Sequence, residues 1–231
     1  MAGKIAIVAD IHSNLVALDQ ALHRIKLEGI DEIVVCGDIV GYGRYPNECC
    51  ELIRSIGCVV IAGNHDWAVA GKTEYKETHS DKAIAGIEKT KEVITPENRN
   101  WLSGLPLTFQ HPKENIKFVH SSLVQTENWY YLTLGEPSDT STWQNVIINF
   151  KAMEKDQICF VGHSHIPIIF LETTLNQVKL IKPSKFTYNL CGKRAIIDVG
   201  SVGYPRNEKN NASFVIYDPG KDTVEFVRYK M

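Results

Sequence analysis

The sequence predicts an α/β fold in which two mixed β-sheets pack face to face, with helices on their outer sides. Two observations lead to this prediction. The first third of the 231 residues alternates short apolar runs with segments of helical periodicity, whereas the last third is a succession of strand-like segments. No linker separates the two halves, so we expect one domain over residues 1–231.

The first third predicts a βαβαβ unit. Strands are expected at residues 4–10, 32–38 and 58–63. The helix over residues 14–28 has leucine and isoleucine side chains along one face, and Ser13 is its expected N-cap. The second helix begins at Pro46, whose fixed φ suits a first helical position, and ends at Gly57. Such units form parallel strands, and their ligands collect at the carboxyl ends of those strands.

The rest of the chain changes from helices to strands. Residues 80–105 are expected to be helical, with a separate turn that begins at Pro96. A hairpin at residues 111–114 joins two expected strands, and a helix over residues 140–153 leads into another strand. Further strands are expected at residues 167–172, 177–182, 186–190, 194–200, 213–218 and 224–230. Turns such as the one at residues 218–222 separate them, which indicates a meander.

The composition is typical of a soluble globular protein. Hydrophobic residues make up 44% of the chain, charged residues 23%, and the net charge is -2, so bulk electrostatic binding of nucleic acid is not expected. No apolar run approaches the roughly 18 residues of a membrane span, and the first ten residues indicate a strand rather than a signal sequence. The six cysteines lack CxxC spacing, which favours reduced thiols and a cytoplasmic location. The oligomeric state is left open.

Polar clusters with metal-type ligands follow five of the expected strands. They are ADIHSN at residues 9–14, CGDIVGYG at 36–43, AGNHD at 62–66, FVHSS at 118–122 and FVGHSH at 160–165. An aspartate after a strand is more often only a helix N-cap, and a lone His-x-His pair is more often a solvated surface feature. The Asn-His-Asp run is more specific, since it offers an oxygen ligand, a proton carrier and a carboxylate together. Five such clusters in succession favour a metal site over coincidence.

These clusters resemble the motifs of the calcineurin-like metallophosphoesterase superfamily, which are DxH, GDx, GNH followed by an acid, a lone His, and GHxH. The resemblance runs from the first strand to beyond Gly200, so it covers nearly the whole chain. The segments VGYGRYPNE at residues 40–48 and GSVGYPRN at 200–207 look like those of a group of small bacterial and archaeal phosphodiesterase-like proteins. The resemblance implies a four-layer αββα sandwich, in agreement with the pattern of strands and helices.

The resemblance also implies two metal positions that share Asp38. The first is implied to be held by Asp10, His12, Asp38 and His165, and the second by Asp38, Asn64, His120 and His163. Mixed imidazole and oxygen ligands suit manganese, iron, zinc, nickel or cobalt, with manganese favoured, and disfavour magnesium alone. Hydrolysis is implied to proceed by attack of a metal-bridging hydroxide on phosphorus.

Three further residues are candidates for roles near the substrate. His65 is implied to lie near the leaving oxygen, where an imidazole with a pKa near 6.5 can donate a proton. Asp66 is a candidate to orient His65, although an N-cap role is equally consistent with the sequence. Arg206 is a candidate for a phosphate contact, with a surface arginine as the equally plain alternative. The remaining histidines are interpreted as helix surface (His23) and loop residues (79 and 111).

The favoured function is phosphodiester hydrolysis of a small or nucleotide-like molecule. Phosphomonoesterase and dinucleoside polyphosphate hydrolase are the alternatives, but relatives with phosphoprotein or dinucleoside tetraphosphate substrates often carry a GDxVxRG motif, and this chain has GDIVGYG at residues 37–43. A binding or scaffold protein that has lost its chemistry is the alternative from another class. A Rossmann-type binder is excluded because DIHSN, rather than a glycine-rich turn, follows the first strand.

Overall fold

The computed structural model describes residues 3–132, 140–174, 177–184, 186–207 and 209–231, which form two six-stranded sheets. The first sheet has the order β3-β2-β1-β11-β12-β9. Its strands are β1 (Ile5–Val8), β2 (Glu32–Cys36), β3 (Val59–Ile61), β9 (Thr187–Asn189), β11 (Ala212–Asp218) and β12 (Thr223–Tyr229). The strands β1, β2 and β3 are parallel, with α1 (Leu15–Leu27) and α2 (Pro46–Ile56) between them, which confirms the predicted βαβαβ unit.

The second sheet has the order β4-β5-β6-β10-β7-β8 and is also mixed. Its strands are β4 (Thr108–Gln110), β5 (Ile116–Val119), β6 (Ile158–Val161), β7 (Ile168–Thr174), β8 (Gln177–Ile181) and β10 (Ala195–Asp198). The strands β5, β6 and β10 are parallel, and the predicted hairpin joins β4 to β5. The helix α6 (Thr140–Ala152) precedes β6.

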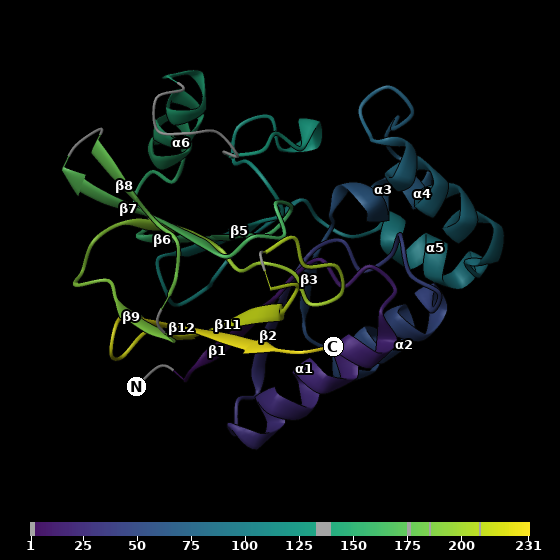
Figure 1. The fold of residues 1–231 in the computed structure, drawn as a ribbon, viewed down its shortest axis with the longest axis horizontal. Helices are drawn as coiled ribbons and strands as arrows, with labels where there is room; N and C mark the ends of the chain where they lie inside the picture. The colour runs from purple at the N-terminus through teal and green to yellow at the C-terminus, as the bar shows by residue number, and fades with distance from the viewer. Residues whose placement is uncertain (1–2, 133–139, 175–176, 185, 208) are drawn as a thin grey trace.

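The side chains alternate between two faces of each strand, and three apolar clusters result. In β1, Ile5 and Ile7 point into the core between the two sheets, whereas Ala6 and Val8 face the helices. The outer face of the second sheet packs against Phe150 and other apolar residues of α6. In Figure 1, α6 lies on the side of the second sheet and α1 and α2 lie on the side of the first. The predicted arrangement of two mixed sheets flanked by helices is confirmed.

Three helices between β3 and β4 lie at one end of the sheets (Figure 1). They are α3 (Asn64–Ala70), α4 (Asp81–Val93) and α5 (Pro96–Ser103), and a 3-10 turn, η1 (Thr126–Asn128), follows β5. The helical segment predicted at residues 80–105 is therefore confirmed, including the new start at Pro96. Within the described ranges, no helix combines the length and the apolar character needed to cross a membrane.

Two predictions about local structure are wrong. The last third is not a meander, because β10 inserts between β6 and β7 while β9 pairs with β12 in the other sheet. All four residues of β10 are buried, so this strand is stabilised by pairing on both edges in the middle of a covered sheet. The N-cap of α1 is Asn14 rather than Ser13, because the backbone of Ser13 is bonded to Ile39 and Tyr45 in the loop after β2.

Candidate metal centre

The structure brings all seven predicted ligands together at the carboxyl ends of five strands. Asp10 and His12 follow β1, Asp38 follows β2, Asn64 begins α3 after β3, His120 follows β5, and His163 and His165 follow β6. Backbone hydrogen bonds hold the loops in register, with the amide of Asp10 donating to the carbonyl of Gly37 and the amide of Gly162 donating to the carbonyl of His120. All seven side chains are buried.

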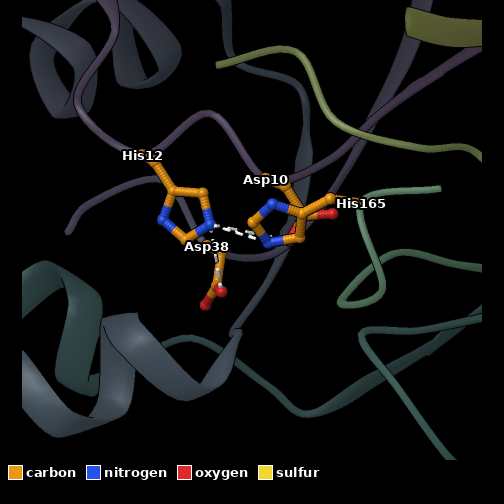
Figure 2. Close-up of side chains that lie close together, drawn as sticks. All are labelled: Asp10, His12, Asp38 and His165. Atoms are coloured by element: carbon orange, nitrogen blue, oxygen red, sulfur yellow. Dashed lines mark hydrogen bonds and ion pairs between the residues drawn. The ribbon is translucent and has the colours of Figure 1, made fainter. Parts of the chain in front are cut away.

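The first group consists of Asp10, His12, Asp38 and His165, whose ligand atoms all lie within 4.8 Å of one another. Figure 2 shows these side chains close together on the loops that follow β1, β2 and β6. The Nε2 atoms of His12 and His165 are 3.1 Å apart, and Nε2 of His165 lies 3.4 Å from Oδ1 of Asp10. Metal–nitrogen bonds of about 2.0–2.1 Å place two imidazole nitrogens on one ion about 3 Å apart. The spacing therefore fits one shared cation.

The second group consists of Asp38, His120 and His163, with Asn64 beside them. Nε2 of His120 lies 3.4 Å from Oδ2 of Asp38 and 3.2 Å from Oδ1 of Asn64. Nε2 of His163 is buried and has no hydrogen-bond partner among the described residues. A buried nitrogen without a partner costs free energy unless something binds it. Asp38 belongs to both groups, as the sequence predicts.

Backbone carbonyls fix which nitrogen of three imidazoles faces the centre. Nδ1 of His12 lies 3.1 Å from the carbonyl oxygen of Val40, and Nδ1 of His120 lies 2.7 Å from that of Cys36. Nδ1 of His165 contacts the carbonyl oxygen of residue 204 in the same way. A carbonyl only accepts, so each Nδ1 carries a proton and each Nε2 faces the centre, as in metal-binding histidines.

The backbone at the centre is unusual. Five of the seven predicted ligands have left-handed conformations, with φ between 47° and 70°: Asp10, His12, Asp38, His163 and His165. Such φ values are uncommon for residues other than glycine and accumulate at functional sites. Gly63 allows its backbone to lie close to the Asp38 carboxylate, because a Cβ atom at position 63 would lie only 2.1 Å from Oδ1 of Asp38.

Asp38 and His120 form a buried ion pair at the centre. Burial alone would raise the pKa of Asp38, but the nearby imidazoles, His120 foremost, hold it well below its ordinary value. Burial opposes protonation of His120, yet the carboxylates of Asp38 and Asp10 raise its pKa to about 10. Burial lowers the pKa of His12, His163 and His165, which leaves them neutral. His120 therefore has to release its Nε2 proton before it can hold a metal ion.

Comparison with known proteins shows the family of the chain. Residues 3–192 match the calcineurin-like phosphoesterase family. The chain belongs to this family. A metallophosphoesterase of Sphaerobacter thermophilus has a similar structure, with 32% identity, a TM-score of 0.82, and coverage of 100% of this chain and 89% of the other. An uncharacterised protein of Methanocaldococcus jannaschii is 40% identical over 229 residues, which are 97% of this chain and 86% of that protein.

A more distant relative is an enzyme whose substrate is named. The symmetrical bis(5'-nucleosyl)-tetraphosphatase of Glaesserella parasuis is 27% identical over 124 residues, which are 51% of this chain and 44% of that enzyme. This chain therefore matches less than half of the length of that relative. Members of the calcineurin-like phosphoesterase family are metal-dependent hydrolases of phosphoesters, and the clustered carboxylates and imidazoles match that chemistry.

The contacts of Asp66 differ from those expected of a residue that orients His65. Its carboxylate accepts hydrogen bonds from the backbone amides of Asp38, Ile39, Val40 and Gly63, at 2.8–3.2 Å. Among the described residues, no hydrogen bond joins it to the His65 ring, and Nδ1 of His65 has no partner. Asp66 occupies the N3 position of α3, with Gly63 as the N-cap. It therefore fixes the loop that carries Asp38.

Replacing Asp66 with Asn is expected to destabilise the metal-free protein by about 3 kcal/mol or more. The Asn side chain keeps one acceptor oxygen and presents an NH₂ group to amides that need acceptors. Urea unfolding measures the change in free energy. Asp81→Asn is the matched control, because Asp81 is an exposed acid in the first turn of α4. Equal stability of the two variants would contradict the role assigned to Asp66.

A pocket of about 520 Å³ opens over the centre. His65 lines it, and burial lowers the pKa of this imidazole to about 4, so the expected value near 6.5 does not hold in the free protein. Arg206 also lines the pocket, is exposed, and donates a hydrogen bond from Nη1 to Oη of Tyr131 at 3.3 Å. Aromatic rings form much of the wall, including the stacked pair Tyr42 and Tyr204, 4.4 Å apart.

The three remaining histidines have different surroundings. His23 is exposed on α1, as predicted. His111 lies in a loop, as predicted, but is buried, and its Nε2 lies 2.8 Å from Oε1 of Glu32. His79 is also a loop residue, yet it lines the pocket and contacts Asn64. Sequence reasoning missed this contact because no strand precedes His79 and no motif contains it. Only the fold brings residues 64 and 79 together.

Proposed function

We propose that the centre holds two divalent transition-metal ions. Asp10, His12, Asp38 and His165 hold the first ion, and Asp38, Asn64, His120 and His163 hold the second. Two observations support this assignment: Nε2 of His163 has no hydrogen-bond partner among the described residues, and the Nε2 atoms of His12 and His165 lie 3.1 Å apart. Imidazole, carboxylate and amide ligands together favour manganese, with iron, zinc, nickel and cobalt as alternatives.

We infer that the protein hydrolyses phosphodiesters of small or nucleotide-like molecules. One observation carries this inference: the pocket that is lined by ligands of both groups also has four aromatic side chains in its wall, Tyr42, Trp129, Tyr131 and Tyr204. When bound, the two ions supply a water activated for attack and stabilise charge on the phosphoryl oxygens. The pocket is larger than one phosphate group, and its aromatic walls suit organic substituents on both sides of the phosphorus.

Side chains around the pocket take complementary roles in this proposal. His65 hydrogen-bonds to the leaving oxygen, and a bound phosphate anion favours the protonated imidazole that transfers a proton to it. Asp66 acts indirectly, by holding the Asp38 loop. Arg206 can pivot from Tyr131 to a phosphate oxygen because its guanidinium is exposed at the pocket. The cysteines are free thiols, and burial raises the pKa of the Cys36 thiol. Free thiols support a cytoplasmic location.

The metal-loaded protein is expected to hydrolyse bis(p-nitrophenyl) phosphate faster than p-nitrophenyl phosphate, by at least about 10-fold in kcat/KM. A diester occupies both sides of the aromatic pocket, whereas a monoester leaves one side empty and carries an additional charge. Release of p-nitrophenol measures both reactions under identical conditions. A preference for the monoester would contradict the assignment. Absence of turnover with every first-row metal would support a scaffold protein instead.

A second candidate function is hydrolysis of dinucleoside polyphosphates. Lys82 and Arg206 both line the pocket, and neither has an acidic partner within 4.0 Å among the described residues. Two basic side chains suit a substrate with several phosphates. The relationship to a bis(5'-nucleosyl)-tetraphosphatase supports this candidate. Adding dinucleoside polyphosphates to the substrate panel distinguishes the two functions by kcat/KM.

A further inference from the structure

His79 contacts a proposed metal ligand although it lies outside all five motifs. It belongs to the segment between α3 and α4. Its Nε2 lies 2.7 Å from Nδ2 of Asn64, and its Nδ1 lies 2.9 Å from Oγ1 of Thr78. The other end of the Asn64 amide, Oδ1, lies 3.2 Å from Nε2 of His120. A chain of contacts thus leads from the pocket wall to the second ligand group.

The direction of the Asn64 amide decides whether it can hold a cation. Its Oδ1 is an acceptor and can coordinate, whereas its Nδ2 carries two protons and cannot. With Nδ2 donating to Nε2 of His79, the ring must offer a lone pair there and carry its proton on Nδ1. Nδ1 then donates to the hydroxyl of Thr78, which is the partner that this tautomer requires.

We propose that His79 is a positioning residue for the second metal ion. Its Nε2 lone pair holds the NH₂ group of Asn64 away from the centre, so that Oδ1 faces the position shared with His120. The inference rests on the proposed function, because it takes Asn64 as a ligand. The reversed amide would place NH₂ protons where the cation belongs. An acceptor at position 79 therefore selects the orientation that can bind.

Other contacts keep the His79 ring in place. The ring meets His65 edge to face at 5.7 Å and Tyr75 at 6.3 Å between centroids, and the backbone amide of His79 donates to the carbonyl of Tyr75. These contacts supply a purely structural alternative, in which the ring only packs the segment. That alternative depends on the shape of the ring, whereas the proposal depends on an acceptor atom directed at Asn64.

Manganese binding to four variants tests the proposal. EPR of free Mn²⁺ during titration of metal-free protein gives the affinity of each equivalent without any substrate. His79→Ala is expected to weaken binding of the second ion about 10-fold and to leave the first unchanged. His79→Gln restores an acceptor and is expected to bind nearly as the wild type does. His79→Lys offers only donors and is expected to weaken the second ion more than Ala does. His23→Ala, on the exposed face of α1, is the control.

The outcomes separate this proposal from the proposed function. If the wild type binds two ions and His79→Ala binds both with the same affinities as the wild type, the role of His79 is overturned and the dinuclear centre is not. Equal losses in His79→Ala and His79→Gln would show that the ring shape matters rather than the acceptor, and would also overturn it. A wild type that binds fewer than two ions would overturn the dinuclear centre itself. Thermal unfolding of the metal-free variants identifies any loss of the fold.

Discussion

Replacing Asp38 with Asn is expected to lower kcat/KM on the order of 10³-fold and to abolish paired metal binding. Asp38 is the only side chain that belongs to both ligand groups among the described residues, and its carboxylate is buried. Two cations held close together repel each other strongly, so the negative charge between them is needed to hold both. Asn keeps the size of the side chain and removes that charge.

The Asp38→Asn experiment measures kcat/KM for a diester and the number of Mn²⁺ ions bound per chain. Asp19→Asn, an exposed acid on α1, is the matched control, and we expect it to keep both properties. Loss of activity with two ions still bound would show that Asp38 does not bridge them. Urea unfolding of the metal-free variant separates a binding defect from a folding defect, because Oδ1 of Asp38 also accepts from the amide of His65.

Replacing His65 with Ala is expected to lower kcat by about 10²–10⁴-fold for a diester with an alkyl leaving group. An alkoxide needs a proton as it leaves. Of the two pocket imidazoles outside the ligand groups, His79 contacts Asn64, which leaves His65 as the proposed donor. The loss should be much smaller with p-nitrophenolate, which leaves as a stable anion. Two ions should still bind, because the side chain of His65 is not a proposed ligand.

The comparison of leaving groups makes the role of His65 testable. Parallel kcat measurements on an alkyl diester and on bis(p-nitrophenyl) phosphate supply the contrast within one variant. An equal loss on both substrates would mean that His65 positions the phosphate rather than protonates the leaving oxygen. A loss of bound metal would mean that the His65 ring supports the neighbouring ring of His12, 4.8 Å away between centroids.

Much of the fold was predictable because local signals agree with tertiary packing. Pro46 and Gly57 bound α2 as their backbone preferences require, and the apolar runs of β1 and β2 form buried parallel strands. The position of β10 was not predictable, because strand order depends on contacts between distant segments. Periodicity identifies a strand but does not select its partners.

The clustering of the seven candidate ligands was predictable for a related reason. Parallel strands end at one edge of a sheet, so polar clusters that follow successive strands meet there. The carbonyl contacts of His12 and His120 and the amide contacts of Asp66 were not predictable, since they join residues with no sequence signal in common. The same holds for His79, which reaches Asn64 only through the turn between α3 and α4.

The central claim is that two ions, held by two ligand groups that share Asp38, carry out the hydrolysis. The most direct test adds Mn²⁺ stepwise to metal-free protein and measures turnover of bis(p-nitrophenyl) phosphate at each step. The proposed centre predicts little turnover after the first equivalent and a plateau at two ions per chain. Full activity with one ion per chain, or activity independent of metal, would contradict it.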